Sequence, residues 1–436
     1  PIWGDPLDVP AEATAAAVAP EFKQPELTAP VGFTIETAVA APLVRFPMMA
    51  CLDDRGRMFV CEAAGVNLFG PDLAIVEPNS ILMVVDKDGD GVFDASTVFA
   101  DHMTFPSGCV WHDGALYVSS APYIWRLRDT DGDGVADERT ALVGKFADSG
   151  IADSLHGPHF APDGRIYWVH GIGGDGHEVR DAAGALIVKS DAPGIFSCWP
   201  DGSDIRKHCA GGMNNPVELD FTDAGQMIGT VNLLKNRPRD DALVQWIWGG
   251  LYPHNGGVIE GLPRTGDLLD STYSFGHVAV SGLTRLRTAQ LGDDYRDSFL
   301  VTQFNTQRVV RVNFTPNGST YVGEQHDFLA STNPDVHFTD VLEDADGSVL
   351  VVDTGGWFRN GCPVSQIAKP NVLGAIYRIR RADAKPIDDP RGNKLGWDQA
   401  TPEALAALLD DDRPAVRERA LAALVAQGQS AFPGLQ

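Results

Sequence analysis

The segment Pro162-Asp163-Gly164-Arg165-Ile166-Tyr167-Trp168 decides the fold of this chain, because it joins a tight polar turn to the start of an apolar strand. The glycine permits the positive φ that such a turn requires. The apolar residues after it fit a half-buried β-strand. One such unit would predict only a hairpin, whereas regular recurrence along the chain predicts a larger repeat architecture.

The pattern recurs along residues 50 to 380, each time as a polar turn followed by apolar strand residues. The turns end at Gly56, Gly114, Gly164, Gly225, Ser298 and Gly347. Successive copies are 58, 50, 61, about 72 and about 50 residues apart. A period of about 40 to 60 residues with several strands per unit is typical of a β-propeller blade, whereas the strands of a sandwich recur about every 8 to 12 residues. The sequence therefore predicts an all-β, six-bladed β-propeller.

The two ends of the chain differ from this repeat. Residues 1–30 are rich in Ala and Pro and predict an arm or linker before a propeller spanning 31–382. In residues 383–436, Thr401-Pro402-Glu403 predicts a helix start, and Val416 to Val425 predicts a second helix that ends near Gly428. This short α-helical segment resembles one HEAT repeat, and solenoid repeats need neighbours. We expect it to belong to a longer helical array, with packing on the propeller as the alternative.

Charge and hydropathy exclude several classes of function. The formal charge is −25, from 34 Lys+Arg against 59 Asp+Glu. Such a chain is repelled by phosphate backbones and anionic lipid, so we expect no nucleic-acid partner. No apolar run approaches the ~18 residues of a membrane span, so we expect no membrane insertion.

The six cysteines show no CxxC spacing, which argues against a zinc site, a redox motif or an attached c-type haem. Cys51 and Cys61 flank one turn, and Cys198 and Cys209 flank another. Both pairs predict disulfides across hairpins in an oxidising compartment, with buried free thiols as the alternative.

Two acidic loops predict calcium sites. Each has carboxylates at positions 1, 3, 5 and 9 and a glycine at position 6, as in loops that wrap a hard cation in oxygen ligands. The carboxylates are Asp86, Asp88, Asp90 and Asp94 in the first loop, and Asp129, Asp131, Asp133 and Asp137 in the second. A threonine stands at position 12 of both loops, where a bidentate Glu would complete the site. We expect these calcium ions to be structural, because each loop joins two strands of a blade.

Histidines from several blades form the next candidate site. His156 and His159 precede the third turn, His170 and His177 follow the strand after it, and His254 and His277 lie in later loops. Loops at one face of a propeller converge on its central channel, so these imidazoles could act as a general base or as metal ligands. We name His156, His159, His254 and His277 as the catalytic candidates.

The ordered segments "SLHGPHFAPDGRIYWVHG", "GGMNNPVELDFTDAG", "VAVSGLTRL" and "FTDVLEDADGSVLVVDTGGWF" resemble the soluble pyrroloquinoline-quinone sugar dehydrogenases. More closely, the chain resembles the secreted, sorbosone dehydrogenase-like "membrane-bound dehydrogenase" propellers of planctomycetes and verrucomicrobia. The twin acidic loops and a HEAT segment after the propeller are typical of that group. The resemblance covers about residues 30–380 and the helical tail.

This resemblance implies roles for individual residues. His156 matches the histidine that takes the hydroxyl proton of the substrate. Asn214 and Asn215 match the quinone-contacting Arg-Asn-Pro motif, with Asn214 in place of the arginine. Two further cationic residues of the family are matched by Arg285 (or Arg287) and by Arg308 (or Arg311). A tricarboxylated quinone needs several cations, so the missing arginine and the charge of −25 count against it.

The resemblance implies a secreted or periplasmic enzyme that oxidises a hydroxyl or aldehyde of a carbohydrate or polyol with a quinone-type acceptor. Because the chain has no CxxCH motif, electrons would pass to a separate partner such as a c-type cytochrome. Two alternatives stay open. One is a carbohydrate lyase or hydrolase with a His/metal centre, using Glu218, Asp340 or Asp353 as acid or base. The other is a non-catalytic propeller that binds carbohydrate or protein, with Trp168, Trp246, Trp248, Tyr252 or Trp357 stacking on sugar rings.

Overall fold

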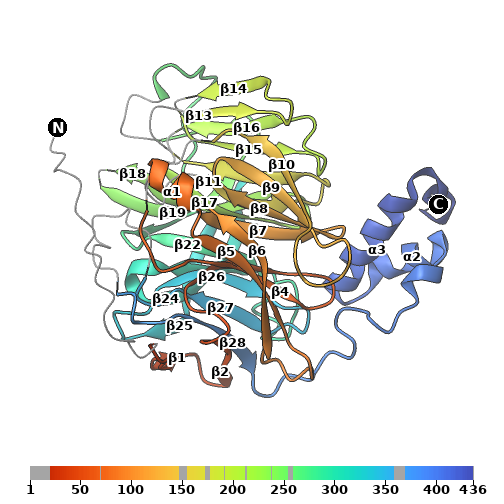
Figure 1. Ribbon diagram of the computed structural model, residues 1–436. Helices are drawn as coiled ribbons and strands as arrows, with labels where there is room; N and C mark the ends of the chain where they lie inside the picture. Colours follow the sequence, from red (N-terminus) through yellow and green to blue (C-terminus); the bar gives the residue numbers. More distant parts are fainter. Residues whose placement is uncertain are drawn as a thin grey trace.

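The computed structural model describes residues 20–68, 70–146, 155–171, 177–190, 192–211, 214–236, 238–253, 259–357 and 369–435. The strands form six sheets arranged around a central axis, and a few short helices follow at the C-terminal end (Figure 1). This confirms the predicted six-bladed β-propeller. No described helix is both long and apolar enough to cross a membrane.

The first three blades each begin with their innermost strand. Blade 1 comprises β3 (Pro47–Leu52), β4 (Met58–Glu62), β5 (Asn79–Val85) and β6 (Ala95–Met103), with helix α1 (Gly70–Val76) between β4 and β5. Blade 2 comprises β7 (Pro106–His112), β8 (Ala115–Ser120), β9 (Tyr123–Arg128) and β10 (Glu138–Gly144), extended by β13 (His177–Arg180) and β14 (Leu186–Ser190). Blade 3 comprises β11 (Leu155–Phe160), β12 (Ile166–His170), β15 (Gly194–Cys198) and β16 (Arg206–Gly211), and the short β20 (Leu251–Tyr252) adds to it in parallel.

The last three blades follow the same order. Blade 4 comprises β17 (Asn215–Phe221), β18 (Met227–Asn236), β19 (Arg239–Trp246) and β21 (Tyr273–Gly276). Blade 5 comprises β22 (Val280–Arg285), β23 (Phe299–Gln303), β24 (Arg308–Asn317) and β25 (Thr320–Ser331), with a 3-10 turn at Phe304–Thr306. Blade 6 comprises β26 (Phe338–Glu343), β27 (Val349–Asp353) and β28 (Ala375–Arg381).

The ring is closed by the N-terminal part of the chain. Strand β2 (Phe33–Ala40) pairs antiparallel with β28 and becomes the outer strand of blade 6. The two-residue β1 (Leu27–Thr28) pairs with β25 at the outer edge of blade 5. The local turn pattern did not predict this, because both pairings join residues more than 300 positions apart in the sequence.

Each of the six predicted turns stands between the first and second strand of a blade. Gly56, Gly114, Gly164, Gly225 and Gly347 all have positive φ, from 72° to 91°. The apolar residues of neighbouring blades meet in six separate clusters, one at each interface between blades. The core of the molecule therefore lies between the blades.

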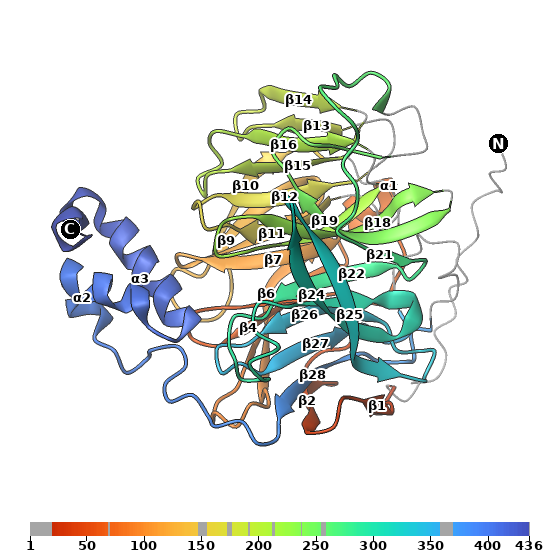
Figure 2. The ribbon, with the colours of Figure 1, turned by 180° about the vertical axis from the view of Figure 1, so that it is seen from behind.

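The C-terminal helices lie where the sequence predicts them. α2 (Pro402–Ala407) is capped by Thr401, whose Oγ1 accepts a hydrogen bond from the amide of Ala404. α3 (Pro414–Gln427) follows after the 3-10 turn Leu408–Asp410. Further 3-10 turns span Trp397–Gln399 and Gly428–Leu435. Figures 1 and 2 place these helices on one side of the ring and α1 on the opposite side. The HEAT-like assignment stays a prediction.

The predicted hairpin disulfides are absent among the described cysteines, which are all free. Cys209 lies opposite Ile195 on β15, whereas Cys198 lies three residues further along that strand and therefore on its other face. Accordingly the two side chains pack into different interfaces between blades. Cys51 and Cys61 share one face of blade 1 but stand opposite Phe59 and Met49, not opposite each other. Cys362 lies outside the described residues.

Candidate functional site

The two faces of the propeller differ, and we name them by the direction of the innermost strands. These strands begin at the entry face, which carries α1, and end at the tail face. The side chains of Arg287, two residues past the end of β22, and Glu418 on α3 form an ion pair, so the helical tail belongs to the tail face.

One polar residue per blade lies on the second strand at the entry face. Each ends, or nearly ends, the second strand of its blade and pairs in register with the first residue of the innermost strand. These residues are Glu62, Ser120, His170, Asn232, Gln303 and Asp353, and together we call them the polar ring. Five of these residues are buried, and Asn232 is partly exposed. Sequence reasoning missed most of this ring.

The polar ring stabilises the loops that enter the innermost strands. The Glu62 carboxylate accepts hydrogen bonds from the amides of Arg45 and Phe46, at 2.7 and 3.0 Å. The Asp353 carboxylate accepts from the amides of His337 and Gly355. Burial raises the pKa of Glu62 to about 7 and that of Asp353 to about 6. These groups satisfy buried backbone donors and so hold the entry face in shape.

His156 and Asn215 meet at the centre of the entry face. His156 is the second residue of β11, Asn215 is the first residue of β17, and each is 8% exposed. The Nε2 atom of His156 lies 3.2 Å from Oδ1 of Asn215. If Nε2 carries the proton and donates to that amide oxygen, Nδ1 is the unprotonated nitrogen of the ring. This contact joins the innermost strands of blades 3 and 4.

Two further histidines lie beside this pair. Burial, with a smaller contribution from His156, lowers the pKa of His159 to about 3. Its Nε2 atom is buried and has no hydrogen-bond partner within the described part of the chain. The Nδ1 atom of His170 lies 2.9 Å from the carbonyl oxygen of Gly171, and burial lowers the pKa of His170 to about 4. Both imidazoles are therefore neutral near pH 7.

The other predicted residues are spread around the same end of the ring. His277 is exposed, just before β22, and Asn214 precedes β17, where its amide donates to the carbonyl of Leu233. Arg308 opens β24 and forms an ion pair with Asp327 at 2.9 Å. His254 lies outside the described residues. The structure thus brings together His156, His159 and Asn215 of the predicted set.

Arg285 lies at the opposite end of the channel from His156. It is the last residue of β22, roughly 16 Å along the strand from the entry face at about 3.3 Å per residue. Its guanidinium forms ion pairs with Asp223 at 2.8 Å and with Asp297 at 2.5 Å. Arg285 therefore serves the tail face, where it is neutralised by two carboxylates.

The cations that the resemblance assigns do not fit a tricarboxylated quinone. Such a group needs cations that are free to pair with its carboxylates. Arg285 is distant, and Arg308 already pairs with Asp327. The alternatives Arg287 and Arg311 pair with Glu418 and Asp294. Asn214 replaces the expected arginine. We therefore assign no chemical step to a quinone.

Deeper in the channel, two carboxyl groups from different blades are in contact. Glu218 on β17 and Asp340 on β26 are hydrogen-bonded to each other. Glu218 also accepts from the amide of Leu283 at 2.6 Å, and Asp340 from the amide of Ala50 at 2.8 Å. Burial and the neighbouring carboxyl raise the pKa of Glu218 well above its usual range, and burial raises that of Asp340 to about 7. The pair holds one shared proton near neutral pH.

Comparison with known sequence families identifies the family of this chain. Residues 19–246, slightly more than half of the chain, match the sequence profile of a domain of unknown function, DUF7133. The chain belongs to the DUF7133 family. No curated protein matches this DUF7133 chain.

Solved structures similar to this DUF7133 chain are six-bladed propellers related to sugar dehydrogenases. An oxidoreductase described as a glucose dehydrogenase from Thermus thermophilus is 17% identical, covers 80% of this chain and 100% of its own, and has a TM-score of 0.52. The PQQ domain of pyranose dehydrogenase from Coprinopsis cinerea is 13% identical, covers 83% and 98%, and has a TM-score of 0.54. A calcium structure of the Trichoderma reesei carbohydrate-active enzyme family AA12 gives the same values. At these identities the likeness establishes the fold.

The two acidic loops of the DUF7133 chain have the same conformation. In the first, Asp86 accepts hydrogen bonds from the amides of Gly89 and Gly91, and Asp129 does the same in the second with Gly132 and Gly134. Three carboxylates converge in each loop, with ligand atoms within 4.8 Å of one another. They are Asp86, Asp88 and Asp94 in one loop and Asp129, Asp131 and Asp137 in the other.

The carboxylate at the fifth position of each loop stands apart from the other three. Asp90 and Asp133 do not belong to the converging groups, and each accepts a hydrogen bond from the amide two residues ahead. Three converging carboxylate oxygens fit a hard cation such as calcium, which takes oxygen ligands from a flexible loop. A calcium ion bound there would hold the hairpin between two outer strands, far from His156 in the sheet order.

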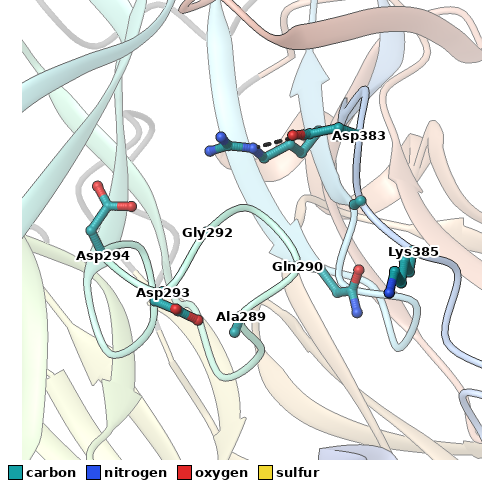
Figure 3. Close-up of a pocket in the computed structure, with 9 residues that line it drawn as sticks. Ala289, Gln290, Gly292, Asp293, Asp294, Asp383 and Lys385 are labelled. Carbon is teal, nitrogen blue, oxygen red and sulfur yellow. Dashed lines mark hydrogen bonds and ion pairs between the residues drawn. The ribbon is translucent and has the colours of Figure 1, made fainter.

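A shallow cleft of about 660 Å³ lies on the tail face, away from the histidines. It lies between the loop that holds Ala289, Gly292 and Asp294 and the segment from Arg381 to Lys385 (Figure 3). Arg381 forms an ion pair with Asp383 at 2.9 Å. The charged groups of the cleft are therefore partly paired, and the cleft contains none of the predicted site residues.

Proposed function

We propose that this chain is a dehydrogenase-like propeller that oxidises a carbohydrate or polyol at its entry face, with His156 as the proton acceptor. The observation that carries this proposal is the contact between His156 and Asn215 at the start of two innermost strands. Asn215 orients the imidazole from outside the reacting centre, and the imidazole of His156 takes the proton of the substrate hydroxyl. The neutral His159 beside it adds no positive charge that would oppose proton uptake.

The oxidation also needs a two-electron acceptor. The similar structures include a PQQ domain, which supports trying that cofactor, whereas the described cations argue against it. We include in the proposal structural calcium in the acidic loops, a secreted or periplasmic location, and re-oxidation by a separate c-type cytochrome. Each of these parts can fail without affecting the role of His156.

The test is a substrate screen on the purified full chain. Aldoses and polyols are assayed by dye reduction, with calcium and with or without added quinone. We expect His156→Ala to lower the rate about a hundredfold or more, the usual contribution of a general base. His326→Ala is the control, because this histidine is partly exposed on β25 of blade 5. No oxidation with any acceptor, or full activity in His156→Ala, would refute the proposal.

The alternative readings are less well supported. Glycosidases need two carboxyl groups about 5 to 9.5 Å apart, whereas Glu218 and Asp340 are in direct contact. Of the five aromatic residues suggested for sugar stacking, four are buried within the blades and only Trp248 is exposed, at 64%. Neither a carboxylate-based hydrolase nor an aromatic binding platform built from those residues is favoured.

A further inference from the structure

Three of the cysteines converge on the interface between blades 1 and 2, although they are up to 58 residues apart in the sequence. Cys51 lies near the end of β3, Cys61 lies on β4, and Cys109 lies on β7. All three side chains belong to the same apolar cluster. β3 and β7 are the innermost strands of neighbouring blades, so this cluster lies close to the channel.

Cys109 is the centre of this group. Its Sγ atom lies 3.4 Å from Sγ of Cys51 and 3.7 Å from the carbonyl oxygen of Phe59. The thiol of Cys61 is hydrogen-bonded to it as well, and burial raises the pKa of Cys61 well above its usual range. Cys61 is fully buried, whereas Cys51 is partly exposed. An oxidant from solvent can therefore reach the group through Cys51.

We propose that Cys51 and Cys109 form a disulfide-forming site that links the innermost strands of blades 1 and 2. The two sulfur atoms already touch, so closing the bond requires only a small movement of two side chains. The proposal does not depend on the proposed enzymatic function. It also replaces the predicted pairing of Cys51 with Cys61, because the partner of Cys51 comes from the next blade.

The chemistry is a thiol–disulfide exchange with a small disulfide such as glutathione disulfide. The Cys51 thiolate attacks one sulfur of glutathione disulfide, forms a mixed disulfide and releases one glutathione thiolate. The thiol of Cys109 then loses its proton and attacks the Cys51 sulfur, which releases the second glutathione. In total, two protein thiols become one disulfide, and one glutathione disulfide becomes two glutathione thiols.

Cys61 gives the site an alternative partner. Because its thiol contacts Cys109 from the second strand of blade 1, a bond between Cys61 and Cys109 is the natural rearrangement product. Cys61 has no exposed surface, so it cannot be the first residue that an external oxidant attacks. The order of reaction therefore begins at Cys51 and ends at Cys109.

The test is thiol mapping of the folded chain after exposure to glutathione disulfide. Free thiols are blocked by alkylation, and peptides are identified by mass spectrometry without reduction. We expect a Cys51–Cys109 linked peptide and a higher unfolding midpoint in the oxidised protein, because the bond closes a loop in the unfolded chain. Reduction should reverse both changes.

Two variants make the result specific. Cys51→Ser should abolish the linked peptide and the oxidation-dependent shift in midpoint, whereas Cys198→Ser, at the interface of blades 2 and 3, should leave both intact. Cys61→Ser should still form the Cys51–Cys109 bond. Full alkylation of Cys51 and Cys109 after oxidation, or a bond from Cys51 to any other cysteine, would overturn the proposal.

Discussion

At the scale of single residues, buried carboxyl groups solve a problem that the propeller creates. The innermost strand of each blade has a free edge facing the channel, and its amides need hydrogen-bond acceptors. Asp340 accepts from Ala50 of blade 1, and Glu218 accepts from Leu283 of blade 5. Each carboxyl group thus bonds to the backbone of the next blade, and the contact between the two groups links four of the six blades.

This arrangement predicts how stability depends on pH. The pKa of Asp340 is raised to about 7 by burial, from about 3.8 in the unfolded chain. Between these values the folded state holds a proton that the unfolded state releases, so stability is lost as pH rises through this window. Asp340→Asn keeps a hydrogen-bonding side chain without a proton to lose. We expect this variant to flatten the decline, which reaches about 1.4 kcal/mol per pH unit for one proton.

The measurement is urea unfolding of the wild type and Asp340→Asn at pH 5 and pH 8. Asp327→Asn is the control, because this aspartate is largely exposed on β25. Equal slopes of stability against pH in wild type and Asp340→Asn would show that the titration of Asp340 contributes nothing to this pH dependence.

At the scale of elements, the turns could be predicted from the sequence, but the long-range pairings could not. Each turn glycine marks the start of a second strand, and the polar ring follows at a fixed distance. Glu62, Ser120, His170 and Asp353 all stand six residues after their turn glycine, so this signal was available. The pairing of β2 with β28 and the contact of Cys51 with Cys109 have no local signal, because they depend on how blades meet.

The candidate site, like the fold, could be predicted only in part from the sequence. The resemblance named His156 and Asn215 together, and the structure brings them into contact, although His156 lies on strand β11 and not in a loop. The resemblance matches single residues but does not say at which face of the propeller each one lies. Arg285 was therefore assigned to the same site, whereas its strand places it at the tail face. Burial, which makes His159 neutral, depends on the packing of neighbouring blades and is absent from the local sequence.

The acidic loops carry a prediction about metal removal. Three carboxylates within 4.8 Å repel one another unless a cation lies between them. We expect calcium to raise the unfolding midpoint and excess EDTA to lower it. Each occupied loop should add about 2.7 kcal/mol of stability at a calcium concentration about a hundred times Kd. Thermal unfolding with calcium and with EDTA measures this.

The loops have nearly the same hydrogen bonds, so they can be tested separately. Asp86→Asn and Asp129→Asn should each remove part of the calcium effect, and the double variant should remove it completely. Asp113→Asn, in a turn of blade 2 outside both acidic loops, is the control. A midpoint that is the same with calcium and with EDTA would contradict this prediction.

At the scale of the whole molecule, closure of the ring distinguishes this fold from an open array of repeats. In an open array each repeat contacts only its neighbours, and the terminal repeats can fray. Here β2 completes blade 6, and an apolar cluster joins blade 6 to blade 1. All six interfaces are therefore filled within the described residues. The N-terminal strand thereby stabilises the first blade and the last blade together.

A charge placed on the buried side of β2 should open the ring. Val39 is 2% exposed and lies opposite Ile376 of β28, in the cluster between blades 6 and 1. We expect Val39→Asp to cost about 3 kcal/mol or more, because it buries an unpaired charge. Thr34→Asp is the matched control, because Thr34 lies on the same strand but is exposed. Urea unfolding followed by tryptophan fluorescence should give one transition for the wild type and for Thr34→Asp, and an earlier or split transition for Val39→Asp. If Val39→Asp unfolds at the wild-type midpoint, β2 does not hold the ring closed.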